Sequence, residues 1–356
     1  MVTERKTPAR RRRPPALDLA LQGGGSHGAF TWGVLDRLLE DEGLAFSGIS
    51  GTSAGALNAG VLATGYANGG RAGARAALAS FWADVGASGA CFGGAAARLP
   101  GRGLATFNLD QNPLFAWANQ FLQLFSPYQL NPFDLNPLRD VAARHVDEAA
   151  MQAGPIAVFV TATAVRTGQP RVFGARELTL DALLASACLP HLFRAVEIGG
   201  QPYWDGGYSG NPAIWPLIYN TPAVDILLVK INPLVRPGTP ETAEEIADRV
   251  NEITFNAGLV GEMRAIAFVQ RLVAQGRLDP GQYKNLRLHM VADDRGLAPL
   301  DASSKLNTDP VFLARLHGLG RGAAERWLKA HRDDIGKRST LDIGKTFLAT
   351  RDAALG

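Results

Sequence analysis

The sequence predicts an α/β protein built on a parallel sheet, and three stretches near its start carry that prediction. An apolar segment at Leu17–Leu21 is typical of a short strand, and a second one lies at Leu44–Ile49. Between them a helix is predicted, with apolar residues at helical spacing: Phe30, Val34, Leu35, Leu38 and Leu39. An Ala- and Leu-rich helix follows at Ala56–Thr64. Strand, helix and strand in this order form a βαβ unit, which makes the two strands parallel.

The rest of the chain continues with the same alternation. Strands are predicted at Ile156–Val165, Arg171–Phe173, Ala195–Ile198, Ile226–Ile231 and Leu286–Val291, and helices at Leu138–His145, Leu180–Cys188, Glu244–Gln275 and Pro310–His331. The long helix contains Gly258 and Gly261, where we expect a break. Residues 67–105 are rich in Gly and Ala and are expected to form helix and loop.

Domain organisation follows from the absence of repeats and of any internal linker. We expect a basic, disordered leader over residues 1–15 and one domain over 16–356, with a helical extension from about residue 240. The chain of 356 residues has 46% hydrophobic and 19% charged residues, which indicates a folded protein with a large core.

Charge is concentrated in the leader. Residues 1–15 carry a net charge of +5, whereas the whole chain carries +3. The remaining residues therefore carry a net charge of −2 and are not expected to bind nucleic acid. The leader could contact acidic lipid, although a solvated tail is the simpler interpretation. Arginines at 10–13 do not form a twin-arginine export signal, because Asp18 and the glycines from Gly23 interrupt the apolar stretch that must follow.

Location and metal binding are constrained by what the sequence lacks. No apolar run reaches about 18 residues, so we expect no transmembrane helix. The two cysteines, Cys91 and Cys188, are far apart and lack the spacing of metal ligands, so a reducing cytoplasm, no structural disulfide and no metal site are expected.

The segment Gly51-Thr52-Ser53-Ala54-Gly55 has the pattern of a nucleophile elbow. It lies between a predicted strand and a predicted helix, and such a turn exposes the hydroxyl of its central serine. Gly51 and Gly55 would let strand and helix approach closely. Because glycine is abundant in this chain, a Ser/Gly turn that merely caps a helix remains an alternative.

The loop Gly23-Gly24-Gly25-Ser26-His27-Gly28 follows the first predicted strand. It matches a dinucleotide-binding pattern, but the acidic residue that would bind the ribose is missing from the end of the second strand. Glycine amides at a helix N-terminus can instead form an oxyanion hole. Ser26 lies in a second Gly-x-Ser-x-Gly pattern and is a rival nucleophile, although His27 beside it is badly placed to act as its base.

A serine nucleophile needs a base, and Asp205 is the strongest candidate. A hairpin through Gln201–Trp204 delivers it into a glycine turn with Gly206 and Gly207. Burial would have to raise its pKa for it to accept a proton near neutral pH. An Asx-type turn is the structural alternative for Asp205. A late histidine such as His289 would serve a Ser–Asp–His triad instead.

Aromatic and aliphatic residues are concentrated in the segment Phe107–Phe133. This segment could be a lid or a lipid-facing patch, and an ordinary core helix is the alternative. A lipid-facing patch would also suit a non-catalytic lipid-binding protein.

Taken together, these residues resemble the patatin-like phospholipase family. Three motifs occur in the family's order: Gly23–Gly28, Gly51–Gly55 and Asp205-Gly206-Gly207. The segment Ser186–Pro190 before the Asp, and Trp204 and Asn211-Pro212 around it, add to the likeness. The resemblance runs through Leu19–Ala59 and Ser186–Pro212 and is weaker elsewhere.

The resemblance implies a three-layer α/β/α sandwich with a mostly parallel central sheet. It implies a lipid acyl hydrolase with Ser53 as nucleophile and Asp205 as base, which needs no metal or cofactor. The implied oxyanion hole is formed by Gly23, Gly24, Gly25 and Gly28. Such a protein would meet its lipid ester substrate in the cytoplasm, at a membrane or lipid-granule surface.

One position departs from the family pattern. Members often carry Arg or Lys where His27 stands, and that cation can hold a phosphate headgroup. A neutral His27 would do so less well. Simple esters, lysolipids and storage polyesters such as hydroxyalkanoates are therefore alternative substrates.

Overall fold

The computed structural model describes residues 15–88, 103–110, 125–279 and 281–348. In these residues the centre is an eight-stranded sheet with the order β5-β6-β3-β2-β1-β7-β8, and β4 pairs with β3. The strands are β1 (Ala16–Leu21), β2 (Ala45–Thr52), β3 (Ala157–Ala164), β4 (Pro170–Gly174), β5 (Val196–Ile198), β6 (Gln201–Asp205), β7 (Asp225–Val229) and β8 (Arg287–Val291). The neighbours β3, β2, β1, β7 and β8 pair in parallel. The pairs β3–β4, β3–β6 and β5–β6 are antiparallel.

Helices connect and cover the strands. They are α1 (Gly28–Leu39), α2 (Ala54–Ser88), α4 (Pro127–Leu130), α5 (Pro137–His145), α6 (Glu148–Ala153), α7 (Leu180–Ser186), α8 (Trp215–Asn220), α9 (Ala243–Ala274), α10 (Asp294–Leu297) and α11 (Pro310–His331). Short 3₁₀ turns that matter for the site are η1 (Gly25–His27), η5 (Gly206–Tyr208) and η6 (Ser303–Leu306). α2 kinks at Gly69 and Gly70, whose backbone angles are not helical.

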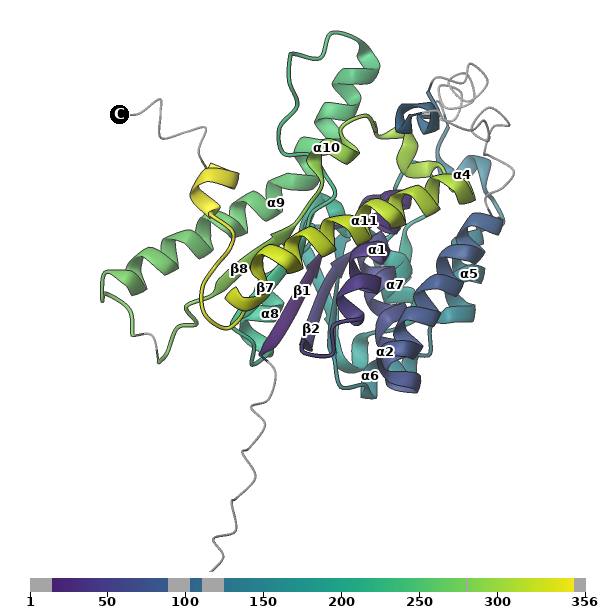
Figure 1. The fold of residues 1–356 in the computed structure, drawn as a ribbon. Helices are drawn as coiled ribbons and strands as arrows, with labels where there is room; N and C mark the ends of the chain where they lie inside the picture. The colour runs from purple at the N-terminus through teal and green to yellow at the C-terminus, as the bar shows by residue number, and fades with distance from the viewer. Residues whose placement is uncertain (1–14, 89–102, 111–124, 280, 349–356) are drawn as a thin grey trace, which may run out of the picture.

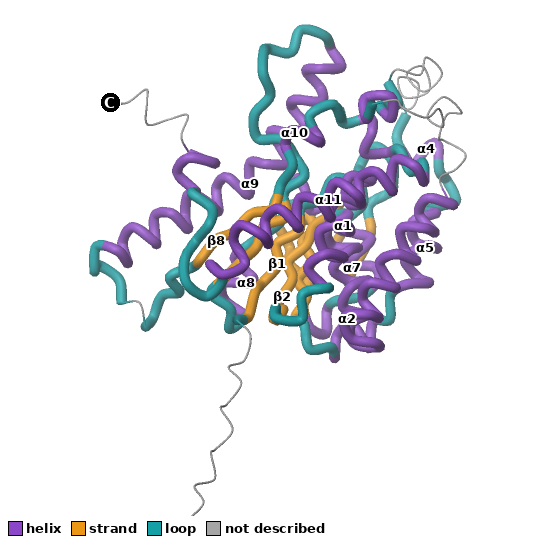
Figure 2. Tube along the Cα trace, in the orientation of Figure 1, coloured by secondary structure: helices purple, strands orange, loops and turns teal. Residues whose placement is uncertain are grey.

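The sheet separates two layers of helices, which confirms the predicted three-layer α/β fold. Figures 1 and 2 show α1 and α11 on the near side of the strands. On that face Leu17, Leu19 and Leu21 of β1 pack with α1, α2 and α11. On the opposite face Ala20 packs with residues of α8 and α9. Burial of both faces explains the nearly continuous apolar sequence of β1.

Two predictions about the second half of the chain need correction. α9 runs without a break, because Gly258 brings the helix close to the backbone of η5: an added Cβ would lie 2.9 Å from the Ser209 carbonyl oxygen. The segment after residue 240 is also more than a helical extension, since it supplies the edge strand β8 and the helix α11 that covers α1.

Glycines let α1 and α11 touch along their backbones. A Cβ added at Gly33 of α1 would overlap the carbonyl oxygen of His317, and one added at Gly320 of α11 would overlap that of Phe30. α1 begins directly after the glycine loop, so α11 helps to fix the position of that loop.

Some expectations lie outside the described residues. These include the basic leader up to residue 14, Cys91 and much of the aromatic segment, over residues 111–124. Among the residues that are described, no helix combines the length and apolarity needed to cross a membrane. The same residues contain no cluster of three or more His, Cys, Asp or Glu side chains placed to hold a metal ion.

Candidate active site

Ser53 occupies a strained turn between β2 and α2. Its φ of 54° is positive, a conformation that non-glycine residues rarely adopt. The neighbouring glycines permit the tight turn: an added Cβ at Gly51 would lie 2.5 Å from the Gly55 carbonyl oxygen, and one at Gly55 would overlap that of Leu21. The elbow geometry therefore occurs at Ser53. The rival Ser26 lies in η1 and does not have a positive φ.

Ser186 holds this turn in place. Its buried hydroxyl accepts a hydrogen bond from the Ser53 amide at 2.8 Å and donates one to the Thr161 carbonyl at 2.6 Å. The strained turn is thus tied to β3 through one side chain. The sequence placed Ser186 in a motif but gave it no role, because contacts between segments so far apart leave no local pattern.

The sheet register brings Asp205 beside Ser53. Thr52 at the end of β2 pairs with Thr161 of β3, and the next residue of β3, Ala162, pairs with Asp205. The turn after Asp205 reaches the elbow, since a Cβ added at Gly206 would lie 3.0 Å from the Thr52 methyl carbon. The antiparallel strand β6 is what returns Asp205 to the carboxyl end of β2.

The two carboxylate oxygens of Asp205 have different surroundings. Oδ1 accepts the Gly207 amide at 2.7 Å, which is the Asx-type turn considered above. Oδ2 is buried and has no hydrogen-bond partner within the described part of the chain. Burial raises the pKa of Asp205 to about 7, while the Gly207 amide, the Ser53 hydroxyl and the charge of Lys305 act in the opposite direction. The Ser53 hydroxyl thus lies near the carboxylate, although its contact falls short of a full hydrogen bond to Oδ2.

The glycine loop packs directly against the elbow. A Cβ added at Gly23 would lie 2.5 Å from the Ser53 Cβ. The Gly23 amide is already engaged, because it donates to Asn211 Oδ1 at 2.6 Å, and the Gly28 amide donates within the first helical turn. The amides of Gly24 and Gly25 donate no hydrogen bond to the described residues. Of the four glycines expected to form an oxyanion hole, only Gly24 and Gly25 have backbone amides that are available as donors in the described residues.

A family model matches the part of the sequence that contains these residues. The model described as patatin-like phospholipase matches residues 19–218, more than half of the chain, including the glycine loop, the elbow and Asp205. The chain belongs to the patatin-like phospholipase family. No protein among curated sequences matches it.

Solved structures of low sequence identity are also similar to this patatin-like chain. VipD from Legionella pneumophila is 14% identical, with a TM-score of 0.39, and the match covers 96% of this chain and 74% of that one. ExoU, in complex with SpcU from the type III secretion system of Pseudomonas aeruginosa, is 17% identical with a TM-score of 0.33, and the match covers 96% of this chain but 59% of the other.

Three buried amide side chains fix the glycine loop in this family member. Asn211 accepts from the Gly23 amide, and Asn232 donates to the Gly23 carbonyl at 2.7 Å. Gln22 accepts from the backbone amides of Ile231 and Asn232 at 2.9 and 3.0 Å. Asn211 was visible in the sequence beside the Asp-Gly-Gly motif, whereas Asn232 follows a buried strand and could not be linked to the loop without the fold.

The two histidines considered above, His27 and His289, are engaged with residues other than Ser53 and Asp205. Within the described residues, no histidine is hydrogen-bonded to Ser53 or Asp205. The ring nitrogens of His289, the alternative triad base, contact Asp225 Oδ1 at 3.1 Å and the Thr340 hydroxyl at 2.9 Å. His27 is buried with Nε2 2.8 Å from the Ser304 hydroxyl, and burial lowers its pKa to about 3, so it is neutral.

Proposed function

We propose that this protein is a serine acyl hydrolase that cleaves the carboxylic esters of lipids with a dyad of Ser53 and Asp205. The observation that carries the proposal is a serine in a strained elbow beside a fully buried carboxyl whose pKa is about 7. A carboxyl with such a pKa is an effective proton acceptor near neutral pH. Membership of the patatin-like phospholipase family supports a lipid as the substrate.

The chemistry follows from the positions of these groups. Ser53 Oγ attacks the ester carbonyl carbon while Asp205 accepts the hydroxyl proton. The negative charge on the carbonyl oxygen is stabilised by the Gly24 and Gly25 amides, and one such donor is typically worth about 10²–10³ in rate. The alcohol leaves with the proton from Asp205. Water then attacks the acyl-enzyme, gives its proton to Asp205 and releases the fatty acid, and that proton returns to Ser53. None of these steps requires a metal or cofactor.

Exposed apolar side chains support a lipid surface as the place of action. Phe133 and Leu135 are 83% and 69% exposed in the loop after α4. The loop follows α4, in which the ring centre of Tyr128 lies 5.1 Å from the Arg194 guanidinium. Cys188 donates to the Arg194 carbonyl, and its own carbonyl accepts the Asp205 amide. These contacts connect the helix before the loop to the candidate base. A cytoplasmic protein that docks on a membrane or lipid granule remains part of the proposal.

Replacement of the nucleophile tests the proposal. Ser53→Ala should lower ester hydrolysis by roughly 10⁴-fold or more, as removal of a serine nucleophile does elsewhere. Ser26→Ala should keep most of the rate, and the reverse result would move the nucleophile to Ser26. A fluorophosphonate probe should label wild type at Ser53, because only an activated serine reacts.

The same probe distinguishes the proposed hydrolase from the alternative of a non-catalytic lipid-binding protein. Tight lipid binding without labelling would support that alternative. The class of ester would be identified by comparing hydrolysis rates on phospholipids, lysolipids, acylglycerols and hydroxyalkanoate oligomers. The comparison covers the storage polyesters and simple esters that the neutral His27 suggests as alternatives.

A further inference from the structure

Lys305 lies in η6, against the glycine loop of the candidate active site. Its backbone packs on Gly25, where an added Cβ would overlap the Lys305 carbonyl oxygen. Its ammonium Nζ donates to Asn232 Oδ1 at 3.0 Å and lies 5.6 Å from the ring centre of Phe255. Both neighbours contact the site themselves, since Asn232 donates to the Gly23 carbonyl and the Phe255 ring packs on Gly207. The cation therefore lies between the oxyanion loop and the Asp205 turn.

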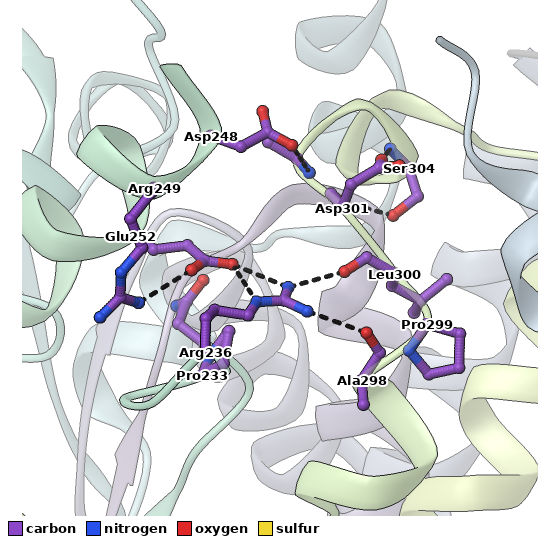
Figure 3. A network of polar contacts seen from close by, with 12 residues as sticks. Pro233, Arg236, Asp248, Arg249, Glu252, Ala298, Pro299, Leu300, Asp301 and Ser304 are labelled. Carbon is purple, nitrogen blue, oxygen red and sulfur yellow. Dashed lines mark hydrogen bonds and ion pairs between the residues drawn. The ribbon is translucent and has the colours of Figure 1, made fainter. Parts of the chain in front are cut away.

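The charge of Lys305 is not neutralised by an ion pair in the described residues. The charges of Glu252, Asp248 and Asp205 act on Lys305 without an ion pair to it in the described residues. Two of these carboxylates are engaged with other groups, as Figure 3 shows: Glu252 binds Arg236 and Arg249 at 2.8 and 3.0 Å, and Asp248 accepts the Ala302 amide. A lysine ammonium has three N–H donors, and one hydrogen bond is formed here. The side chain is half-buried and burial lowers its pKa, which means that water solvates the charge incompletely. An anion at this point would satisfy it.

His27, at the loop position where a cation is common in the family, does not supply this charge. Its ring is neutral and its Nε2 is engaged with Ser304, the residue before Lys305. A small cavity of about 10 Å³, room for about one water molecule, is lined by both His27 and Lys305. The positive charge beside the loop thus comes from a segment outside the residues 19–218 that the family model matches.

We propose that Lys305 determines substrate specificity by binding the phosphate group of a phospholipid whose ester carbonyl lies at the Gly24–Gly25 amides. The inference rests on the proposed hydrolase function and adds the substrate class to it. A glycerophospholipid carries its phosphate a few covalent bonds from the scissile ester, so a cation next to the oxyanion loop can bind it. A neutral ester gains nothing from such a contact, and neither does a hydroxyalkanoate polymer.

The test compares two esters that differ only in the phosphate group. Phosphatidylglycerol and diacylglycerol with the same acyl chains are presented in mixed micelles to wild type, Lys305→Met and Lys305→Arg. Lys305→Met should lower the ratio of kcat/KM for phosphatidylglycerol to kcat/KM for diacylglycerol by roughly 10- to 100-fold, the usual value of a charge-assisted hydrogen bond. Because the charge of Lys305 also lowers the pKa of Asp205, its removal should add an equal loss on both lipids, which leaves this ratio unaffected. Lys305→Arg should restore most of the preference. Lys329→Met, which removes an exposed lysine of α11, is the matched control and should change neither rate.

The outcomes distinguish a failure of the role of Lys305 from a failure of the proposed hydrolase function. Equal losses on both lipids, or no rescue by arginine, would show that Lys305 supports the loop only structurally and would overturn the inference. Absence of all ester hydrolysis in wild type would instead overturn the proposed function. Inorganic phosphate is added as a competitor in the diacylglycerol assay: inhibition without any preference for phosphatidylglycerol would mean that Lys305 binds a free anion, which also contradicts the proposal. If Lys305→Met is unstable by thermal unfolding, Lys305→Gln, which keeps a donor for Asn232, provides the same comparison.

Discussion

The carboxyl of Asp205 divides two tasks between its two oxygens. Oδ1 closes the turn through the Gly207 amide, which fixes the side chain, and Oδ2 is buried without a partner in the described residues. Complete burial disfavours the charged form, so the proton is held until about neutral pH. One residue is therefore both the end of a strand and a candidate base.

The pKa of Asp205 predicts the pH dependence of activity. Because the base must be ionised, kcat/KM should rise with pH and level off above about 7. Asp205→Asn should lower kcat/KM by roughly 10²–10⁴-fold, and the residual kcat/KM of this variant should no longer increase with pH up to about 7. Asp181→Asn, which changes an exposed aspartate, serves as the control and should retain it. A pH profile of Asp205→Asn identical in shape to that of wild type would assign the rise to another group.

Stability should depend on the same titration with a defined sign. The folded-state pKa of Asp205 lies above the ordinary 3.8, so the folded protein loses stability as the pH rises from about 4 to about 7. Asp205→Asn removes this cost and should raise the free energy of unfolding above pH 7, by at most about 4 kcal/mol, with little change below pH 4. Urea unfolding at the two pH values measures the difference.

At the scale of elements, α1 and α11 show how glycine positions the candidate site. α1 starts from the oxyanion loop, and α11 lies against it with backbone contacts at Gly33 and Gly320. The closeness of these helices leaves no room for side chains between them. Movement of α11 would therefore shift the loop that faces Ser53.

A single methyl group in this contact should separate the two helices. Gly320→Ala places a Cβ onto the Phe30 carbonyl, and the strain should lower the free energy of unfolding by about 1–3 kcal/mol. Gly318→Ala is a matched control on the same helix, because its Cβ would meet nothing within 4 Å. It should be neutral or stabilise the protein by up to about 1 kcal/mol through helix propensity. Equal urea midpoints for both variants would contradict this account.

Sequence patterns predicted the strands well and the short helices poorly. Seven of the eight described strands coincide with stretches that the sequence assigned as strands, and β6 coincides with the predicted hairpin through Gln201–Trp204. The central strands are the most apolar, because both faces of the sheet are buried there. The helices α6, α8 and α10 were not predicted, since with four to six residues they are too short to show a period of 3.6.

For the candidate site, local motifs were informative and long-range contacts were not. Ser53 and Asp205 lie in glycine-rich turns with recognisable patterns, and the register of β2, β3 and β6 places them together. Their catalytic roles stay predictions. Asn232 and Lys305 could not be assigned, because their relation to the loop depends on how the sheet edge and η6 close over it.

The aromatic segment was predicted as a unit, but its described parts lie in different environments. Phe107 is buried against Phe312 of α11, with ring centres 4.9 Å apart, whereas Phe133 is 83% exposed. Apolar pattern alone does not distinguish a core residue from one that faces lipid. The core interpretation therefore holds at one end of the segment, and a lipid-facing role at the other end stays a prediction.

For the molecule as a whole, exposed apolar side chains near the site predict a dependence on lipid surfaces. Replacement of Phe133 and Leu135 by serine should lower hydrolysis of vesicle-bound substrate by about tenfold or more, while the rate on a short, soluble ester stays unchanged. Tyr219→Ser is the control, because Tyr219 is 78% exposed on α8 and lies two residues before Thr221, whose hydroxyl contacts Asp18 of β1. Asp18 lies toward the start of β1, whereas the elbow follows the carboxyl end of β2. Equal losses on soluble and vesicle substrates would argue against docking through this loop.

The contact between α1 and α11 also has a consequence for biosynthesis. The glycine loop and the elbow are synthesised well before Lys305, whose cation lies beside the loop, and before α11, which packs on α1 and ends at His331. A nascent chain therefore carries the candidate nucleophile long before the surroundings of the oxyanion loop exist. Ester cleavage should begin only once the chain has been made through α11, so a chain that stops before this helix poses little danger to the lipids of the cell that makes it.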